Sequence, residues 1–130
     1  MKPFYYAHSK NIYGTEEERM QLKFLRTKFS KVLCPNNDVG ELGGMQPYLD
    51  IIEKKCSGVV FSEWFDLVGR GVWEEVKHAK KLKQPIYGLR KVDDKYKLFK
   101  FRSGKVINKD NWMSYAKLFC GESVTDKEIT

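Results

Sequence analysis

Over residues 4–90, short apolar segments alternate with longer amphipathic ones, and only a few folds are compatible with this alternation. The short segments are rich in β-branched and aromatic residues, which favour strands, and the longer ones carry helix signals. The alternation predicts strands at 4–7, 31–34, 57–61 and 86–89, and helices at 15–28, 47–55 and 71–83. With connections of ordinary length, this order predicts a mostly parallel, doubly wound sheet of about four to five strands, of the flavodoxin/Rossmann-like kind.

Capping residues set the expected helix bounds. Thr15 followed by Glu18 fits a capping box, in which the hydroxyl accepts from the amide three residues on and acids suit the positive end of the helix dipole. Pro47 suits the first turn of the second helix, and Pro85 ends the third one.

The alternation of strand-like and helix-like segments ends after residue 90. Residues 96–101 alternate with period two between the turn signals at 93–94 and 103–104, which predicts a hairpin or meander appended to the sheet edge. The apolar spacing from Trp112 to Cys120 predicts a last helix, closed by Gly121. We therefore expect one α/β domain with three parts: a core at 4–90, an appended hairpin and helix at 91–121, and a frayed tail at 122–130.

Composition narrows the class of protein. The chain has 130 residues, of which 42% are hydrophobic and 32% charged, and this balance excludes a disordered or fibrous chain. No apolar run is long enough for a membrane span or a signal peptide, so we expect no membrane partner. An odd set of three cysteines favours reduced thiols and a cytoplasmic protein.

The formal net charge of +7 is concentrated in one stretch. Residues 77–107 hold eleven basic and two acidic residues, so the rest of the chain is slightly acidic. Aromatic Tyr96, Phe99 and Phe101 interleave with lysines there, a pattern that suits single-stranded nucleic acid. We prefer a solvated sheet edge protected by lysines, and keep nucleic acid as the alternative partner.

Ligands of open parallel sheets bind at the carboxyl ends of the strands, where the loops 8–14, 35–44 and 62–71 are expected. The third loop is the most informative, because Gly69 and Gly71 would let the backbone approach a ligand at a helix start. Glycines that only shape a turn are an equally good interpretation.

The phase of the following helix marks one acid. At about 100° per residue, Glu75 falls within the apolar arc of Val72, Val76 and Ala79, whereas Glu74 falls on the solvent side. Burying a carboxylate costs several kcal/mol unless other groups satisfy it. Glu75 is therefore a candidate catalytic group, or else a cap for neighbouring amides.

Two motifs resemble the nucleoside 2-deoxyribosyltransferase superfamily, which includes deoxynucleoside 5′-monophosphate N-glycosidases. Phe4-Tyr5-Tyr6-Ala7-His8-Ser9 is similar to its first strand, and the run from Asp66 to Ala79 is similar to its glycine-rich catalytic stretch ending in Glu-x-x-x-Ala. The resemblance covers roughly residues 4–90 and implies N-glycosidic bond cleavage or transfer on a nucleoside or nucleotide. It assigns the nucleophile to Glu75, its positioning to Tyr5, and binding of the sugar or base to Asp66.

The same resemblance implies a homodimer or larger oligomer and no cofactor. Further substrate-binding candidates lie on the three loops: His8, Ser9, Asn37, Met45, Trp64, Gly69 and Gly71. The cysteines and histidines have no metal-ligand spacing, so we expect no metal site. A non-catalytic nucleotide-binding module and a TIR-like NAD-cleaving enzyme are the alternatives to the glycosidase.

Overall fold

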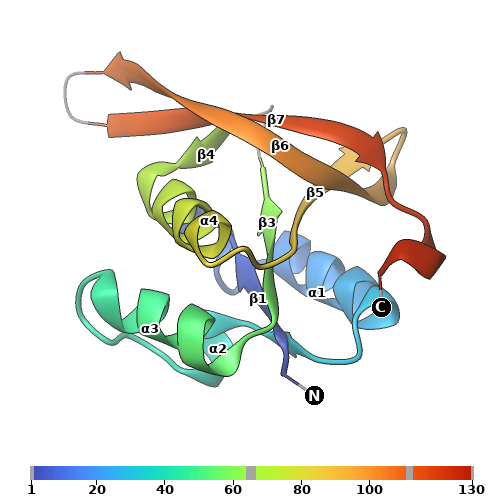
Figure 1. Ribbon diagram of the computed structural model, residues 1–130, viewed down its shortest axis with the longest axis horizontal. Coiled ribbons are helices and arrows are strands. Elements are labelled where there is room, and N and C mark those ends of the chain that lie inside the picture. Colours follow the sequence, from blue (N-terminus) through green and yellow to red (C-terminus); the bar gives the residue numbers. More distant parts are fainter. Residues whose placement is uncertain (1, 64–66, 111–112, 130) are drawn as a thin grey trace.

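The computed structural model describes residues 2–63, 67–110 and 113–129. Over this part of the chain it is an α/β fold, with a seven-stranded mixed sheet and four α-helices (Figure 1). The strands are β1 Phe4–Ala7, β2 Val32–Leu33, β3 Gly58–Ser62, β4 Leu67–Gly69, β5 Ile86–Val92, β6 Lys95–Asp110 and β7 Met113–Ser123. The helices are α1 Glu16–Lys28, α2 Pro35–Asp38, α3 Gln46–Lys55 and α4 Arg70–Lys81, with 3-10 turns η1 Lys10–Ile12 and η2 Asp126–Glu128.

The sheet has a parallel half and an antiparallel half. Its strand order is β2-β1-β3-β5-β6-β7-β4, and the first four strands pair in parallel. β5 and β6 form a hairpin over Asp93 and Asp94, whose φ angles of 50° and 63° match a two-residue turn with both central residues left-handed. The turn predicted at 93–94 is thus confirmed.

Helices lie on both faces of the sheet, and β1 shows how the sequence divides between them (Figure 1). Tyr5 and Ala7 pack on the side of α3 and α4, whereas Tyr6 packs on the side of α1. Successive side chains of a strand point to opposite faces, so a fully buried strand needs an apolar run rather than an alternation. A large apolar side chain such as Val59 or Phe61 of β3 contributes about 1.5–3 kcal/mol when it is fully buried.

The helix predicted at 112–120 is wrong, because its described residues, 113–120, belong to β7. The buried residues of β7 are Ala116 and Leu118, two positions apart, while Phe119 is 44% exposed. β7 pairs with β6 on one side and with β4 on the other, and these distant partners decide the conformation over the local spacing.

The turn predicted at 103–104 is also wrong, since β6 continues through it with register shifts between Phe101 and Ser103. Gly104 has a packing role there. A Cβ atom on Gly104 would lie 2.5 Å from the ring of Trp73, so its absence lets α4 pack directly on β6.

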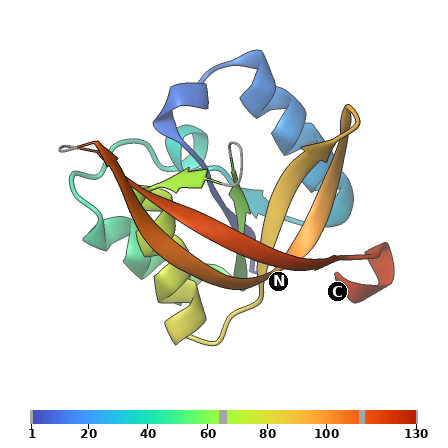
Figure 2. The same ribbon diagram turned by 90° about the horizontal axis from the view of Figure 1, so that it is seen from above.

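The long β6–β7 hairpin curls over α4, and β4 completes the sheet beside it (Figure 2). The loop predicted at 62–70 therefore contains a strand, which pairs Val68 with Ala116. α4 begins at Arg70, directly after the last residue of β4, so β4 fixes the position of the helix start.

The C-terminal tail, expected to fray, packs against the α1 side. Val124 and Ile129 contact the cluster that contains Leu25, and Lys28 Nζ lies 2.8 Å from Asp126 Oδ1. Among the described residues, no helix has the length and apolar character needed to cross a membrane.

Candidate functional site

Glu75 lies on the inner side of α4, as the helical phase predicts. Only 7% of the residue is exposed, and its helical neighbours Val72, Val76 and Ala79 are buried around it. Gly69 is the N-cap of α4 and makes no side-chain cap hydrogen bond. A carboxyl group therefore faces the sheet from an otherwise apolar surface.

The hydroxyl of Tyr5, which lies on β1, donates a hydrogen bond to Oε2 of Glu75 on α4. Burial raises the pKa of Glu75 to about 8, although the bond from Tyr5 lowers it. Burial also raises the pKa of Tyr5, and the charge of Glu75 adds to this increase. Tyr5 thus stays a neutral hydrogen-bond donor, and burial holds the pKa of Glu75 well above that of an ordinary carboxyl group.

Two further tyrosines lie in the neighbourhood of this pair. Tyr13 follows η1 and is 36% exposed; burial, with the charge of Glu75 as the next cause, raises its pKa to about 12. Tyr48, in the first turn of α3, packs against the core cluster that contains Tyr5.

Tyr48 also fixes the loop that precedes α3. Its hydroxyl donates to Gly40 O at 2.8 Å and accepts from Leu42 N at 3.2 Å. The same loop carries Met45, whose Cε would be 3.3 Å from a Cβ atom on Gly71. The structure thus brings Met45 against the start of α4.

Glu74, the neighbour of Glu75, points away from this group. Its Oε1 lies 3.0 Å from Lys77 Nζ on the helix surface. The two consecutive glutamates therefore have opposite environments on one helix.

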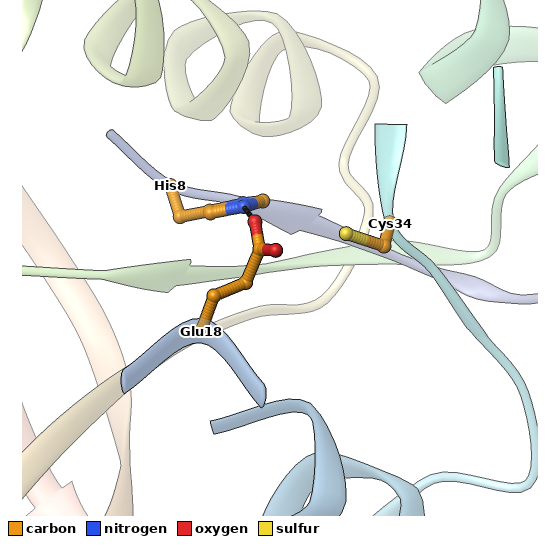
Figure 3. A group of neighbouring side chains, drawn as sticks. All are labelled: His8, Glu18 and Cys34. Atoms are coloured by element: carbon orange, nitrogen blue, oxygen red, sulfur yellow. Dashed lines mark hydrogen bonds and ion pairs between the residues drawn. The ribbon is translucent and has the colours of Figure 1, made fainter. Parts of the chain in front are cut away.

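His8 lies on the α1 side of the sheet, away from Glu75. Its ring stacks on Tyr6 at 3.8 Å between centroids, and its Nε2 is 2.6 Å from Glu18 Oε2 (Figure 3). Ser9 caps η1 by accepting from Asn11 N at 3.2 Å. The side chains of His8 and Ser9 are therefore both engaged in contacts within the protein.

The remaining predicted residues are placed as follows. Asn37 is exposed on α2, and Gly69 and Gly71 flank the start of α4. Asp66 and Trp64 lie outside the described residues. The structure therefore joins Tyr5 to Glu75 and brings Met45 against Gly71, one helical turn before Glu75. His8 is bound to Glu18 instead, with its ring 4.9 Å from that of Tyr13 between centroids.

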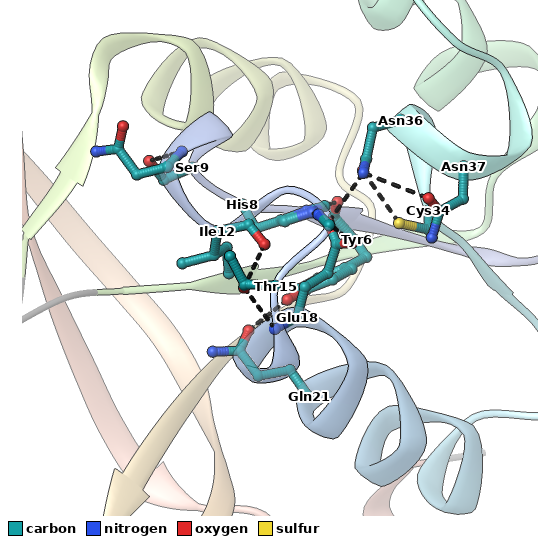
Figure 4. A network of polar contacts seen from close by, with 12 residues as sticks. Tyr6, His8, Ser9, Ile12, Thr15, Glu18, Gln21, Cys34, Asn36 and Asn37 are labelled. Atoms are coloured by element: carbon teal, nitrogen blue, oxygen red, sulfur yellow. Dashed lines mark hydrogen bonds and ion pairs between the residues drawn. The ribbon is translucent and has the colours of Figure 1, made fainter.

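Glu18 is the centre of a second polar group, around the first turn of α1 (Figure 4). Its Oε2 accepts from His8 and, at 3.0 Å, from Asn36 Nδ2, while Oε1 accepts from Gly14 N at 3.1 Å. Thr15 caps α1 as predicted, by accepting from Glu18 N at 3.3 Å. Burial raises the pKa of Glu18, but the three hydrogen bonds outweigh it and hold the pKa below its ordinary value.

The sequence pattern did not identify Tyr13 and Tyr48 as residues near the candidate site, nor Glu18 as the centre of a buried polar group. Tyr13 lies in a loop that the sequence places at the carboxyl edge of the sheet, and Tyr48 lies one residue after Pro47 at a helix start. Both residues belong to segments that the strand order places at the carboxyl edge of the sheet, beside the candidate site. This position is the signal that would have identified them.

Comparisons with protein-family models, with curated proteins and with solved structures found no match to this chain.

Proposed function

We propose that the protein cleaves or transfers the N-glycosidic bond of a nucleoside or nucleotide, with Glu75 as the nucleophile. The observation that carries the proposal is the buried pair of Tyr5 and Glu75, which join β1 and α4 across an apolar interior. The parallel order β2-β1-β3-β5 supports a flavodoxin/Rossmann-like core, in which ligands bind beside such loops and helix starts.

The reaction needs an ionised carboxylate. One oxygen of Glu75 forms a bond to the anomeric carbon of the sugar while the carbon–nitrogen bond breaks, and the base leaves with the electron pair and takes up a proton. Water then attacks the glycosyl ester and loses a proton, which frees the sugar and regenerates the carboxylate. If a second base attacks instead of water, the outcome is transfer.

Burial of Glu75 has two effects on this chemistry: it raises the pKa to about 8, so the ionised form is the minor one at neutral pH, and it makes that ionised form more reactive. A desolvated carboxylate lacks water to stabilise its charge, so positive charge that develops at the sugar ring is a strong electrostatic partner. The hydroxyl of Tyr5 keeps one carboxylate oxygen oriented, which leaves the other free to attack.

Other residues would bind the substrate. We assign the sugar or leaving base to Asp66, and apolar contact with the base to Met45 beside Gly71. Tyr13 offers a partly exposed ring and hydroxyl at the same place. We further propose a homodimer in the cytoplasm as the working form, in line with the family resemblance.

The test is release of free base from a panel of nucleosides and nucleotides, measured by chromatography. We expect Glu75→Gln to lower the rate at least about a thousandfold, because loss of a nucleophile removes the covalent route. Glu74→Gln is the matched control and should keep wild-type activity, since Glu74 pairs with Lys77 on the surface. Full activity in Glu75→Gln would overturn the assignment.

The two alternatives give different results on the same panel. A binding module would leave every nucleoside intact while a ligand raises the melting temperature. A TIR-like enzyme would release nicotinamide from NAD and leave the other substrates unchanged.

A further inference from the structure

We propose that His8, Glu18 and Cys34 form a binding site for a divalent transition-metal ion, with Zn²⁺ as the natural occupant. This site lies on the α1 side of the sheet and is independent of the proposed glycosidase function. It differs from the expectation drawn from sequence spacing, because its residues are far apart along the chain.

The ligand atoms are already close together. His8 Nε2, Glu18 Oε2 and Cys34 Sγ all lie within 4.8 Å of one another, and all three residues are buried (Figure 3). Donor atoms around tetrahedral zinc, with bonds of about 2.0–2.3 Å, are about 3.3–3.8 Å apart. Side-chain movements of about an ångström would therefore complete the geometry.

His8 is oriented as a metal ligand. Its Nδ1 lies 3.0 Å from Tyr6 O, and a carbonyl only accepts, so Nδ1 carries a hydrogen and Nε2 faces the cluster. This outer hydrogen bond to a backbone carbonyl is the usual support of a metal-binding histidine. The ring is further held by stacking on Tyr6.

The chemistry of the three side chains also suits a divalent transition-metal ion. They offer an imidazole nitrogen, a carboxylate oxygen and a cysteine sulfur, which are the donor types that bind zinc in proteins. The carboxylate and the thiolate would together balance the charge of a divalent ion, so the bound ion would add no uncompensated charge to the interior.

Asn36 supplies a fourth donor and an outer contact. Its Oδ1 accepts from Cys34 Sγ at 3.1 Å, and its Nδ2 donates to Glu18 Oε2 at 3.0 Å (Figure 4). The amide oxygen would complete four ligands of nitrogen, sulfur and oxygen, the number that tetrahedral zinc needs. Because the three main ligands are buried, the site would be structural and would tie β1, α1 and the start of α2 together.

The test uses the full chain without a histidine tag, freed of metal by a chelator, and Co²⁺ as the spectroscopic probe. We expect one equivalent of Co²⁺ to produce the visible bands of a tetrahedral site and a sulfur-to-cobalt charge-transfer band. Zn²⁺ should displace the Co²⁺ and raise the melting temperature in a concentration-dependent manner. A wild-type chain that shows neither the charge-transfer band nor a shift in melting temperature would overturn the site.

Variants locate the ion. Cys34→Ser should lose the charge-transfer band, and Asn36→Ala should bind about 10–100-fold more weakly. Cys56→Ser is the matched control, because Cys56 is equally buried but belongs to the other core cluster, and it should keep the wild-type spectrum. If Cys34→Ser fails to fold, the wild-type spectrum and protection of one thiol from alkylation by Zn²⁺ still decide the question. A band that survives in Cys34→Ser and disappears in Cys56→Ser would refute the assignment.

Discussion

Two buried glutamates lie on opposite sides of β1, and their environments differ. Glu18, on the α1 side, accepts hydrogen bonds from His8, Asn36 and the backbone of Gly14, and its pKa is lowered. Glu75, on the α4 side, receives a bond from Tyr5 within a mostly apolar surface, and its pKa is raised to about 8. Burial alone therefore does not identify a reactive carboxylate; the number of donors around it does.

The comparison predicts losses of stability of different size when each side chain is removed. Glu18→Ala should lower the free energy of unfolding by about 3–5 kcal/mol, because it leaves a buried histidine and two amide donors without their acceptor. Glu75→Ala should cost less, since it also removes a poorly solvated carboxyl group. Urea unfolding at neutral pH measures both, and equal losses would show that the two sites do not differ in this way.

Glu75→Gln isolates the cost of the charge, because glutamine keeps the acceptor for Tyr5. The pKa of Glu75 rises from its ordinary value of 4.5 to about 8 on folding, so the folded chain binds more protons between these pH values. Stability of the wild type should therefore fall as pH rises through this window, with no penalty below it. At about 1.4 kcal/mol per pKa unit, the variant should be more stable than wild type by a few kcal/mol above pH 8.

That difference should vanish below pH 4.5, where both side chains are neutral. Unfolding curves at several pH values provide the measurement. A constant difference across the whole range would mean that Glu75 ionises as easily in the folded chain as in the unfolded one.

Tyr5→Phe tests the single donor to Glu75. The bond from Tyr5 lowers the pKa of Glu75, so its loss should move the rising limb of kcat/KM to higher pH. Activity should be roughly tenfold lower at neutral pH and largely restored at alkaline pH. A loss of activity that is the same at every pH would indicate a structural role instead.

Tyr6→Phe is the matching change on the other side of the strand. Tyr6 donates to Gln21, so the variant should lose about 1 kcal/mol of stability and keep the pH profile of the wild type. A shifted profile in Tyr6→Phe would show that the two sides are coupled.

The parts of the structure that follow from local signals were predictable. The apolar runs and caps predict the parallel strands and α1, and the helical phase places Glu75 inside before any contact is known. Thr15 caps α1 because the hydroxyl and the amide it accepts from are three residues apart. Such features depend only on residues that are close to one another in the sequence.

The parts that depend on distant partners were not predictable in this way. β7 has spacing that fits a helix, and it becomes a strand because β6 and β4 pair with it. Glu18 has a helix-capping pattern, yet its partners His8 and Asn36 come from two other segments. The sequence contains these residues but gives no signal that they meet.

The pairing of β4 with β7 has a consequence for the order of folding. β4 precedes α4 directly, yet its partner residues 115–117 come more than forty positions later in the chain. All strands of the parallel half, which ends with β5 Ile86–Val92, are synthesised before β7 Met113–Ser123. The parallel core can therefore assemble while the start of α4 still lacks its neighbour, and during synthesis Glu75 reaches its final surroundings only once β7 has emerged.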